Sequence, residues 1–201
     1  MSGFSSNGTL NGTVSWSTDT PSGQGCSVHF DGSTNAVTVP DSDRYSFPNN
    51  VFTISLWMKA ETTSVFIGVI SKGGGGFEYS LQGPNSSALS LATWNLAGGL
   101  AVYGAANFSY DTKWNQITIT ADGSYLSVYK NGSFLTRAAY GGAASLGNGP
   151  GLLRIGAGLD GAGVRPFTGL VDDVRIYGRA LSVQEIHQMY ASVVSQSVAM
   201  R

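Results

Sequence analysis

Two neighbouring aspartates near the C-terminus, Asp172 and Asp173, have the type and position to do chemistry. They lie in a stretch where Leu170, Val174 and Ile176 follow the two-residue period of a strand with one buried face. Asp172 falls on that same face. Because an isolated buried carboxylate is costly, the sequence predicts that Asp172 is hydrogen-bonded, paired with a cation or bound to a metal.

The chain offers few other groups for catalysis. Its only glutamates are Glu61, Glu78 and Glu185, and none is followed by a carboxylate two or four residues later. A glycosidase needs two carboxyl groups at a set separation. Catalysis by a nucleophile, a histidine and an acid would depend on His29, on a predicted strand, or His187, on a predicted terminal helix. We therefore predict that the protein is not an enzyme.

Composition narrows the fold class and the partners. The chain has 201 residues, 28 of them glycine, with 11% aromatic and 11% charged residues, which suits one large all-β domain with many tight turns. A net charge of −1 without clustered basic residues argues against nucleic acid as a partner. No apolar run approaches the length of a membrane span, so we expect no membrane insertion.

The stretch 52–59 shows a clear strand pattern. Trp57 falls on one face, and the apolar residues on the other face are Phe52, Ile54, Leu56 and Met58. Further along, Asn131-Gly132 between two alternating runs is the strongest short signal for a hairpin.

A helix is predicted after residue 182. Ser182 and Glu185 have the spacing of a capping box, in which each side chain bonds the other residue's backbone N–H. An apolar stripe at helical spacing follows, formed by Ile186, Met189, Tyr190, Val193 and Val194. The sequence therefore predicts a short C-terminal helix that packs on the body of the sheet domain.

The C-terminal stretch also carries a resemblance to a known family. Residues 169–186 read GLVDDVRIYGRALSVQEI. This resembles the closing strand and terminal turn of laminin-G-like, concanavalin A-like domains, and the Phe30-Asp31-Gly32 triplet and the Asn131-Gly132 hairpin are similar to the same family. The resemblance implies a two-sheet antiparallel jelly-roll sandwich with a C-terminal helix, formed by residues 1–201 as a single domain. It is a weak guide to function, because this fold carries lectins, adhesion modules, glycosidases and structural proteins.

The resemblance implies a place for a metal. It puts Asp31 beside Asp172 and Asp173, where their carboxylate oxygens would suit one structural Ca²⁺. The alternative is that Asp172 accepts hydrogen bonds from backbone N–H groups or pairs with Arg175 or Arg179, holding the last strand in place. Both interpretations remain open at the level of the sequence.

Two aromatic residues are candidates for sugar contact. Trp94 and Tyr103 lie on predicted strands, on the face away from the core, with Asn95 as a neighbouring polar contact. A flat aromatic ring on an open sheet face can stack on a pyranose ring. The competing interpretation is that loops of the sandwich cover both rings.

The chain's start and its cysteine bear on where it works. Residues 1–8 show neither the basic nor the apolar region of a secretory signal peptide, so we expect none in this chain. Cys26 is the only cysteine, which excludes an intrachain disulfide, and we expect it to be buried as a small hydrophobe. These features suit a protein made in a reducing cytoplasm, whereas the resembled family works mainly outside cells.

A place on a virion would explain both the cytoplasmic features of the chain and the extracellular work of the resembled family, because virion surface proteins assemble in the host cytoplasm. The sequence therefore favours a non-enzymatic, lectin-like protein on the virion surface, acting in decoration or adhesion. Its partners would be a cell-surface or environmental glycan and other virion proteins, and it could form an oligomer. The alternative is an extracellular carbohydrate-binding or adhesion module cut from a larger secreted protein.

Overall fold

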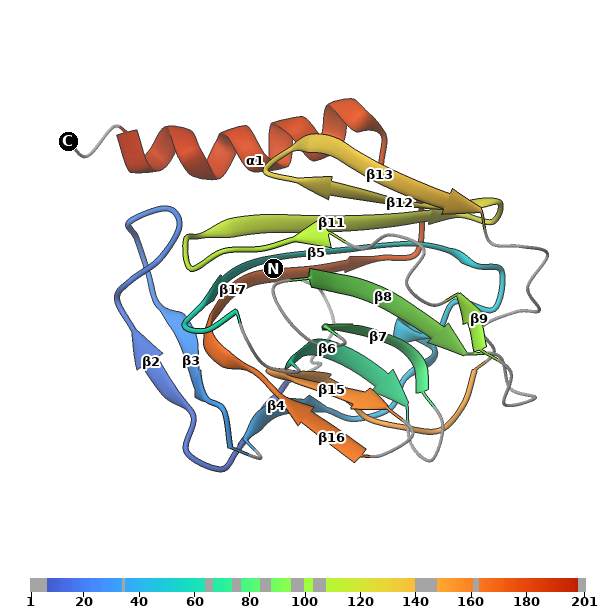
Figure 1. Ribbon diagram of the computed structural model, residues 1–201, viewed down its shortest axis with the longest axis horizontal. Coiled ribbons are helices and arrows are strands. Elements are labelled where there is room, and N and C mark those ends of the chain that lie inside the picture. Colours follow the sequence, from blue (N-terminus) through green and yellow to red (C-terminus); the bar gives the residue numbers. More distant parts are fainter. Residues whose placement is uncertain are drawn as a thin grey trace.

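Two antiparallel sheets face each other in the computed structural model of the chain, with one helix outside them (Figure 1). The structure describes residues 7–33, 35–63, 67–73, 77–83, 88–94, 100–102, 108–139, 148–160 and 163–198. Within them, the predicted all-β, jelly-roll-like class with a C-terminal helix is confirmed.

The first sheet has eight strands among the described residues. In spatial order they are β1 (Thr9–Asn11), β4 (Ala36–Val39), β14 (Leu153–Ile155), β6 (Ile67–Gly73), β7 (Phe77–Gly83), β8 (Ala88–Trp94) and β10 (Phe108–Ser109), with β9 (Leu100–Val102) paired to β8. The second sheet has seven described strands. Their order is β13 (Ser133–Ala139), β12 (Tyr125–Lys130), β11 (Asn115–Asp122), β5 (Val51–Ala60), β17 (Thr168–Tyr177), β3 (Ser27–Asp31) and β2 (Ser15–Ser17). The short strands β1 and β2 are thus edges of opposite sheets.

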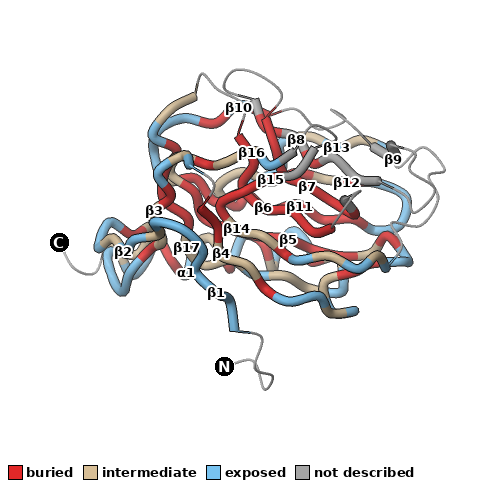
Figure 2. Tube along the Cα trace, turned by 90° about the horizontal axis from the view of Figure 1, so that it is seen from below, coloured by how far each residue is buried: buried red, intermediate tan, exposed pale blue. Residues whose placement is uncertain are grey.

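The core fills the space between the two sheets, and Figure 2 shows its buried residues along the central strands. The predicted alternation of β5 is confirmed, since Phe52, Ile54, Leu56 and Met58 are all buried in this core. Trp57 points to the opposite face, as predicted, and stacks on Tyr190 of the helix with ring centroids 5.5 Å apart.

The closing strand β17 departs from its predicted alternation through a β-bulge. Asp172 pairs with Trp57 and Arg175 pairs with Ser55, so β17 has one more residue here than β5. Asp173 takes the left-handed backbone conformation, with φ of 47°. The bulge reverses which side chains face inward, so Val171 lies in the core before it and Val174 packs on the core after it.

The predicted inward orientation of Asp172 is therefore wrong. Asp172 lies opposite Trp57 in the ladder and shares its face, the one covered by the helix. The sequence could not reveal this, because a two-residue period holds only while no extra residue interrupts the ladder.

Helix α1 (Val183–Val198) packs on the outer face of the seven-stranded sheet, next to the β12–β13 hairpin (Figure 1). The capping box is confirmed, because Glu185 accepts a hydrogen bond from the Ser182 N–H at 2.8 Å and its own N–H donates to Ser182 Oγ at 3.3 Å. The apolar stripe faces the sheet, where Ile186 and Met189 pack with Tyr129. Among the described residues, no helix has the length and apolarity that crossing a bilayer requires.

A second hairpin precedes the closing strand β17. Strands β15 (Ala157–Asp160) and β16 (Gly163–Pro166) pair with each other and lie against β6. A Cβ on Gly68 would sit 2.1 Å from the Gly158 backbone, so the backbones of β6 and β15 approach more closely than any residue other than glycine allows. Ser71 Oγ also donates to the Ala157 carbonyl at 3.0 Å.

One end of the sandwich holds a buried ion cluster, here named the Lys72 cluster. The Lys72 side chain is fully buried, and its Nζ donates to Asp41 Oδ1 at 2.6 Å, Glu78 Oε1 at 2.9 Å and the Gly149 carbonyl at 3.1 Å. Glu78 Oε1 also accepts from Ser46 Oγ at 3.2 Å. The Lys72 ammonium lowers the pKa of the Asp41 carboxyl. The cluster thereby ties the residues before β5 and before β14 to the eight-stranded sheet.

Candidate functional site

The structure separates the three aspartates that were expected to share a metal. In the β3–β17 ladder, Asp31 pairs with Thr168 at one end, and Val28 pairs with Val171 at the other. Asp172 follows Val171, so it lies four residues along the ladder from Asp31, roughly 13 Å at strand spacing. The predicted cluster of Asp31 with Asp172 and Asp173 is therefore wrong, because the register places them at opposite ends of the pairing.

Asp31 instead closes a turn. Its carboxylate accepts hydrogen bonds from the Ser33 N–H at 2.8 Å, Asn35 Nδ2 at 2.7 Å and Thr13 Oγ1 at 3.1 Å. These bonds, with those from Ser33 the largest cause, lower the pKa of Asp31 to about 2. In the described part of the chain, no three His, Cys, Asp or Glu side chains gather as metal ligands. The expected calcium ligand set does not form, and calcium binding by this chain stays a prediction.

Asp172 and Asp173 have different partners although they are adjacent. Asp172 Oδ1 accepts from the Asp173 N–H at 2.7 Å, while Asp173 Oδ1 pairs with Arg175 Nε at 2.8 Å. Arg179 is engaged by Glu185. The expected backbone hydrogen bond to Asp172 is therefore present, but neither arginine pairs with it.

Asp172 is the unusual carboxylate of this pair. Within the described residues, no cation lies at ion-pair distance from it. Partial burial, together with the charge of Asp173, raises its pKa above the ordinary value, although the backbone hydrogen bond opposes this. The fold thus keeps a partly desolvated carboxylate without a counter-charge at the bulge.

Two pockets meet at the bulge, and together they are named the bulge cleft. The ladder between β3 and β17 ends at the Val28–Val171 pair, so β17 loses its β3 partner where the bulge begins. Asp172, Asp173 and Cys26 line both pockets.

The first pocket of the cleft is mainly apolar and has a volume of about 500 Å³. Besides the three shared residues, its lining residues are Gly8, Leu10, Trp16, Val28, Val37, Ile155, Val171 and Val174. They come from strands of both sheets, so this part of the cleft lies at the open edge of the sandwich.

The second pocket is polar and has a volume of about 280 Å³. It lies between the β2–β3 connection, the bulge and the last turns of α1. Besides the three shared residues, its lining residues are Pro21, Ser22, Gln24, Gly25, Arg175, Ser192, Val193 and Gln196. The cleft therefore joins an apolar half to a half rich in hydroxyl, amide and charged groups.

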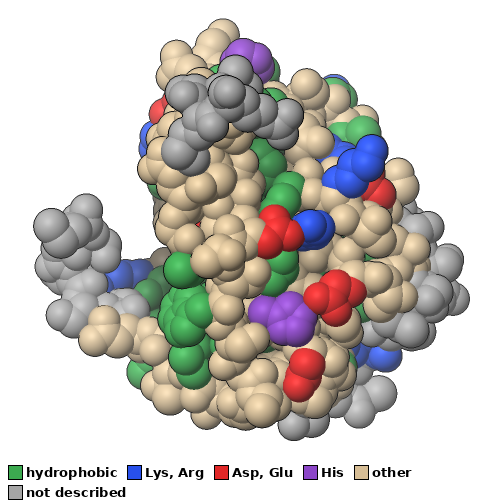
Figure 3. All heavy atoms as spheres, turned by 90° about the vertical axis from the view of Figure 1, so that its left-hand side faces the viewer, with side chains coloured by type: hydrophobic (Ala, Val, Ile, Leu, Met, Phe, Trp, Pro, Cys, Tyr) green, Lys and Arg blue, Asp and Glu red, His purple; other side chains and the backbone are tan. Residues whose placement is uncertain are grey.

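Trp16 is the large exposed aromatic residue of the cleft. Its side chain is 64% exposed, and it pairs with Val28 across the β2–β3 ladder. Leu10, 43% exposed, holds the corresponding position opposite Val37 on the other sheet. Figure 3 shows the hydrophobic side chains that gather on this end of the molecule, next to charged groups.

The charged neighbours of this surface are paired with each other. His29 Nε2 lies 2.7 Å from Glu61 Oε1, and Lys59 Nζ lies 2.5 Å from Asp19 Oδ2. Asp19 also accepts from the Trp114 indole N–H at 2.8 Å. His29 thus lies on a strand, as the sequence predicted, and has a carboxylate partner.

Sequence reasoning missed Trp16 and misjudged Cys26. Trp16 lies on β2, and only the ladder to β3 shows that this residue belongs to an edge strand. Cys26 is exposed, contrary to the expectation that it is buried, because it precedes β3 at the margin of the cleft.

The predicted sugar-contact residues lie at the end of β8 or outside the described residues. Trp94 ends β8, where it pairs with Leu100, but its side chain lies outside the described residues. Asn95 and Tyr103 also lie outside the described residues. Sugar contact by Trp94, Asn95 and Tyr103 stays a prediction.

Solved structures with the same fold include binding domains. Over 94% of this chain and 47% of the other, it superimposes on the receptor binding domain of a botulinum neurotoxin C/D mosaic serotype, with a TM-score of 0.73 and 16% identity. Domain 4 of an extracellular GH43 arabinanase from Geobacillus stearothermophilus, solved in complex with arabinotriose, matches with a TM-score of 0.67 and 18% identity. That match covers 91% of this chain and 87% of the domain. At these identities the likeness shows the fold alone.

Sequence comparison gives the family. A curated relative, the adhesion G-protein coupled receptor V1 of Danio rerio, is 29% identical over 152 residues, which are 69% of this chain and 2% of the receptor. The chain thus spans a small fraction of that relative and about half of the toxin domain. The sequence model of the concanavalin A-like lectin/glucanase superfamily, in its laminin G form, matches residues 31–187, more than half of the chain. The chain belongs to this superfamily, as its closing strand indicated.

Proposed function

We propose that this chain is a single, non-enzymatic laminin-G-like module that binds glycans, and that the bulge cleft is its saccharide site. The observation that carries the proposal is the exposed Trp16 ring in one cleft with Asp172, a carboxylate without a described cation partner. A sugar ring has an apolar C–H face and a rim of hydroxyl groups. The indole suits the face, and the carboxylate suits the hydroxyl groups as a charge-assisted acceptor.

The two halves of the cleft support the same ligand class. The apolar half gives a sugar ring an apolar surface, and Gln196 in the polar half offers a neutral hydrogen-bonding group to a further sugar unit. A cleft of this composition favours a short oligosaccharide over an extended apolar ligand, because an apolar ligand would leave the polar half without partners.

The comparisons support the class of partner without identifying the ligand. One structural neighbour was solved with arabinotriose, another is a receptor binding domain, and the curated relative is an adhesion receptor. The non-enzymatic part of the proposal is supported by the cleft itself. Its two carboxylates are adjacent on one strand and one is held by Arg175, so they do not face each other across a bond as an acid and a base would.

The setting in which the module works is a separate proposal. Display on a virion surface, with other virion proteins as neighbours, stays the prediction made from the sequence. The alternative, a module of a larger secreted protein, is supported by the small share of the adhesion receptor that the chain matches. An antibody against the chain that labels purified virus particles would support the virion, and label found only on cell surfaces or in secretions would exclude it.

The experiment for the glycan site is an array assay with the wild-type chain and three variants, first with calcium and then with EDTA. We expect Trp16→Ala to weaken binding about tenfold, a loss of about 1.4 kcal/mol. The control Tyr125→Ala removes an aromatic residue that is 40% exposed and lies outside the cleft, so it should bind as the wild type does.

Two outcomes would contradict the proposal. Loss of binding in Trp94→Ala with full binding in Trp16→Ala would move the site to the end of β8. If the folded wild-type chain binds no glycan in either buffer, a glycan-binding role is contradicted. Binding that EDTA abolishes would support the calcium prediction, and binding unchanged by EDTA would oppose a metal at the site.

A further inference from the structure

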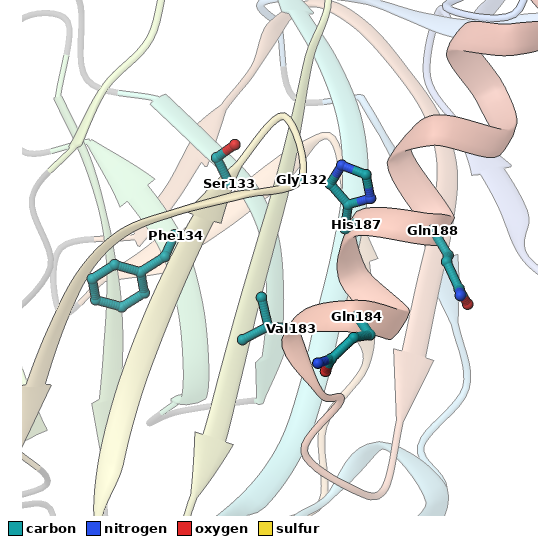
Figure 4. Close-up of a pocket in the computed structure, with 7 residues that line it drawn as sticks. All are labelled: Gly132, Ser133, Phe134, Val183, Gln184, His187 and Gln188. Carbon is teal, nitrogen blue, oxygen red and sulfur yellow. The ribbon is translucent and has the colours of Figure 1, made fainter.

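The helix and the β12–β13 hairpin enclose a pocket that is distinct from the bulge cleft, here named the helix–hairpin pocket (Figure 4). Its volume is about 450 Å³, and its lining residues are Gly132, Ser133, Phe134, Val183, Gln184, His187 and Gln188. We infer that this pocket is a second saccharide site, selective for neutral sugars. The ligand class rests on the proposed function, but the site does not share a residue with the cleft.

Both walls of the pocket are held in position by contacts with neighbouring residues. The hairpin tip lies against the helix so closely that a Cβ on Gly132 would sit 2.9 Å from Tyr190 Cβ. The first turn of the helix is fixed by the capping box and by Arg179, whose Nη2 lies 2.5 Å from Glu185 Oε1. A pocket with fixed walls binds a ligand without first having to order its own backbone.

The apolar surface of the pocket is exposed yet held in position. Phe134 is 54% exposed, and Tyr129 packs edge-on against it with ring centroids 5.7 Å apart and an interplanar angle of 77°. Val183 is also 54% exposed, and in Figure 4 it reaches from the first turn of α1 toward the strand that carries Phe134. An exposed aromatic ring fixed on one edge leaves a face on which the C–H groups of a sugar can pack.

The polar groups of the pocket have no partner among the described residues. No hydrogen bond to the described part of the chain engages the amides of Gln184 and Gln188, the His187 ring or the Ser133 hydroxyl. In Figure 4 the His187 ring lies next to Gly132, Gln184 extends from the first turn of α1, and Gln188 projects on the side of the helix away from Phe134. Amides and hydroxyls both donate and accept hydrogen bonds, which matches the hydroxyl groups of a sugar.

The charge of the lining sets the selectivity. The bulge cleft contains Asp172, Asp173 and Arg175, whereas the described residues that line the helix–hairpin pocket include no Asp, Glu, Lys or Arg. An anionic or cationic sugar would therefore lose hydration here without gaining an opposite charge. The neutral lining favours a neutral saccharide.

The two sites are far enough apart to be filled at once. The helix–hairpin pocket uses Gln184 and the bulge cleft uses Gln196, twelve residues later on the same helix, or roughly 18 Å at helical rise. A chain with two such sites would bind a surface carrying many glycans more tightly than either site alone binds one sugar.

The test is a titration of the ¹⁵N-labelled full chain with three neutral sugars, arabinotriose, lactose and cellotriose, followed by NMR up to about 10 mM. We expect the side-chain amide signals of Gln184 and Gln188 to move in a saturable way. Phe134→Ala should weaken this response at least tenfold. Leu135→Ala is the matched control, because Leu135 is 45% exposed on the same strand but does not line the pocket.

The outcomes separate this inference from the proposed function. If the Trp16 indole signal shifts and the side-chain amide signals of Gln184 and Gln188 do not, the second site is contradicted and the bulge cleft is supported. If the two glutamine amide signals shift equally in the wild type and in Phe134→Ala, the assigned role of Phe134 in the pocket is contradicted. Movement at the glutamines alone, lost in Phe134→Ala, would support the second site and contradict the cleft.

Discussion

The Lys72 cluster and the bulge cleft both contain carboxylates withdrawn from water, yet the two regions treat them differently. In the Lys72 cluster, Glu78 is 4% exposed and bonds the Lys72 ammonium at 2.9 Å. In the cleft, Asp172 is partly buried, its single hydrogen bond comes from the neighbouring backbone N–H, and no cation among the described residues faces it.

The difference separates a structural carboxylate from one available to a ligand. In the Lys72 cluster, the charge of the buried Glu78 is compensated by Lys72 through Oε1, and this ion pair holds chain segments together, although Glu78 Oε2 itself has no hydrogen-bond partner among the described residues. A carboxylate without a counter-charge, lining the same cleft as an exposed aromatic ring, costs the fold some stability and offers an acceptor to a ligand. On this comparison, changes in the Lys72 cluster should affect folding, and changes in the cleft should affect binding.

The largest effect is expected for Lys72→Met. This change leaves Glu78 buried without its counter-charge, so we predict a loss of about 3–5 kcal/mol in the free energy of unfolding, measured by urea denaturation. The control Lys59→Met breaks an ion pair with Asp19 in which both side chains are at least partly exposed, and should cost about 1 kcal/mol or less. If the two variants lose the same small amount, the Lys72 cluster does not have the structural role assigned to it.

The second prediction concerns Asp172→Asn, which removes the charge and retains an oxygen acceptor for the Asp173 N–H. The folded-state pKa of Asp172 is raised, so its ionisation lowers stability as pH rises above the ordinary value of 3.8. The variant should therefore gain up to about 1 kcal/mol at neutral pH, and this gain should vanish below about pH 3. Urea denaturation at both pH values measures it.

Asp31→Asn is the matched control with the opposite sign. The pKa of Asp31 is lowered to about 2, so its ionised form stabilises the fold above the ordinary value of 3.8. The Asn variant should be less stable than the wild type at neutral pH and should converge with it as pH falls to about 2. If Asp31→Asn and Asp172→Asn both raise or both lower the free energy of unfolding at neutral pH, the environments described for these two carboxylates are contradicted.

The smallest effect is expected for Glu185→Gln at the exposed start of α1. Hydrogen bonds from Arg179, and then from Ser182, lower the pKa of Glu185 to about 2, so its contribution is present above 4.5 and lost toward about 2. We predict a small loss of stability at neutral pH that disappears in acid, measured by circular dichroism during acid titration. A difference that persists unchanged at about pH 2 would show that the charge of Glu185 is not its cause.

Local patterns were enough to predict much of the fold. The alternation in β5, the Asn131-Gly132 turn and the Ser182–Glu185 capping box each depend on residues close together in the chain. Asn131 and Gly132 take φ values of 53° and 75°, the left-handed conformation that such a hairpin turn requires. Such local patterns do not depend on which strands are neighbours in the sheet.

The candidate site depended on strand register, which the sequence does not show. Leu170 and Val171 are both aliphatic, so either could have faced the core, and the extra residue at Asp173 leaves no mark in the hydrophobic pattern. Asp31 was placed beside Asp172 by family resemblance, and a register in which Asp31 meets Thr168 moved it away. Trp16 became a candidate only once β2 was found at an open edge.

The most direct test of the central claim is a crystal structure of the chain with the glycan that the array identifies. The account predicts a sugar ring packed on the Trp16 indole, with a hydroxyl group within hydrogen-bond distance of an Asp172 carboxylate oxygen. A sugar bound at Trp94 and Tyr103, or in the helix–hairpin pocket alone with the cleft empty, would contradict the assignment of the bulge cleft as the saccharide site.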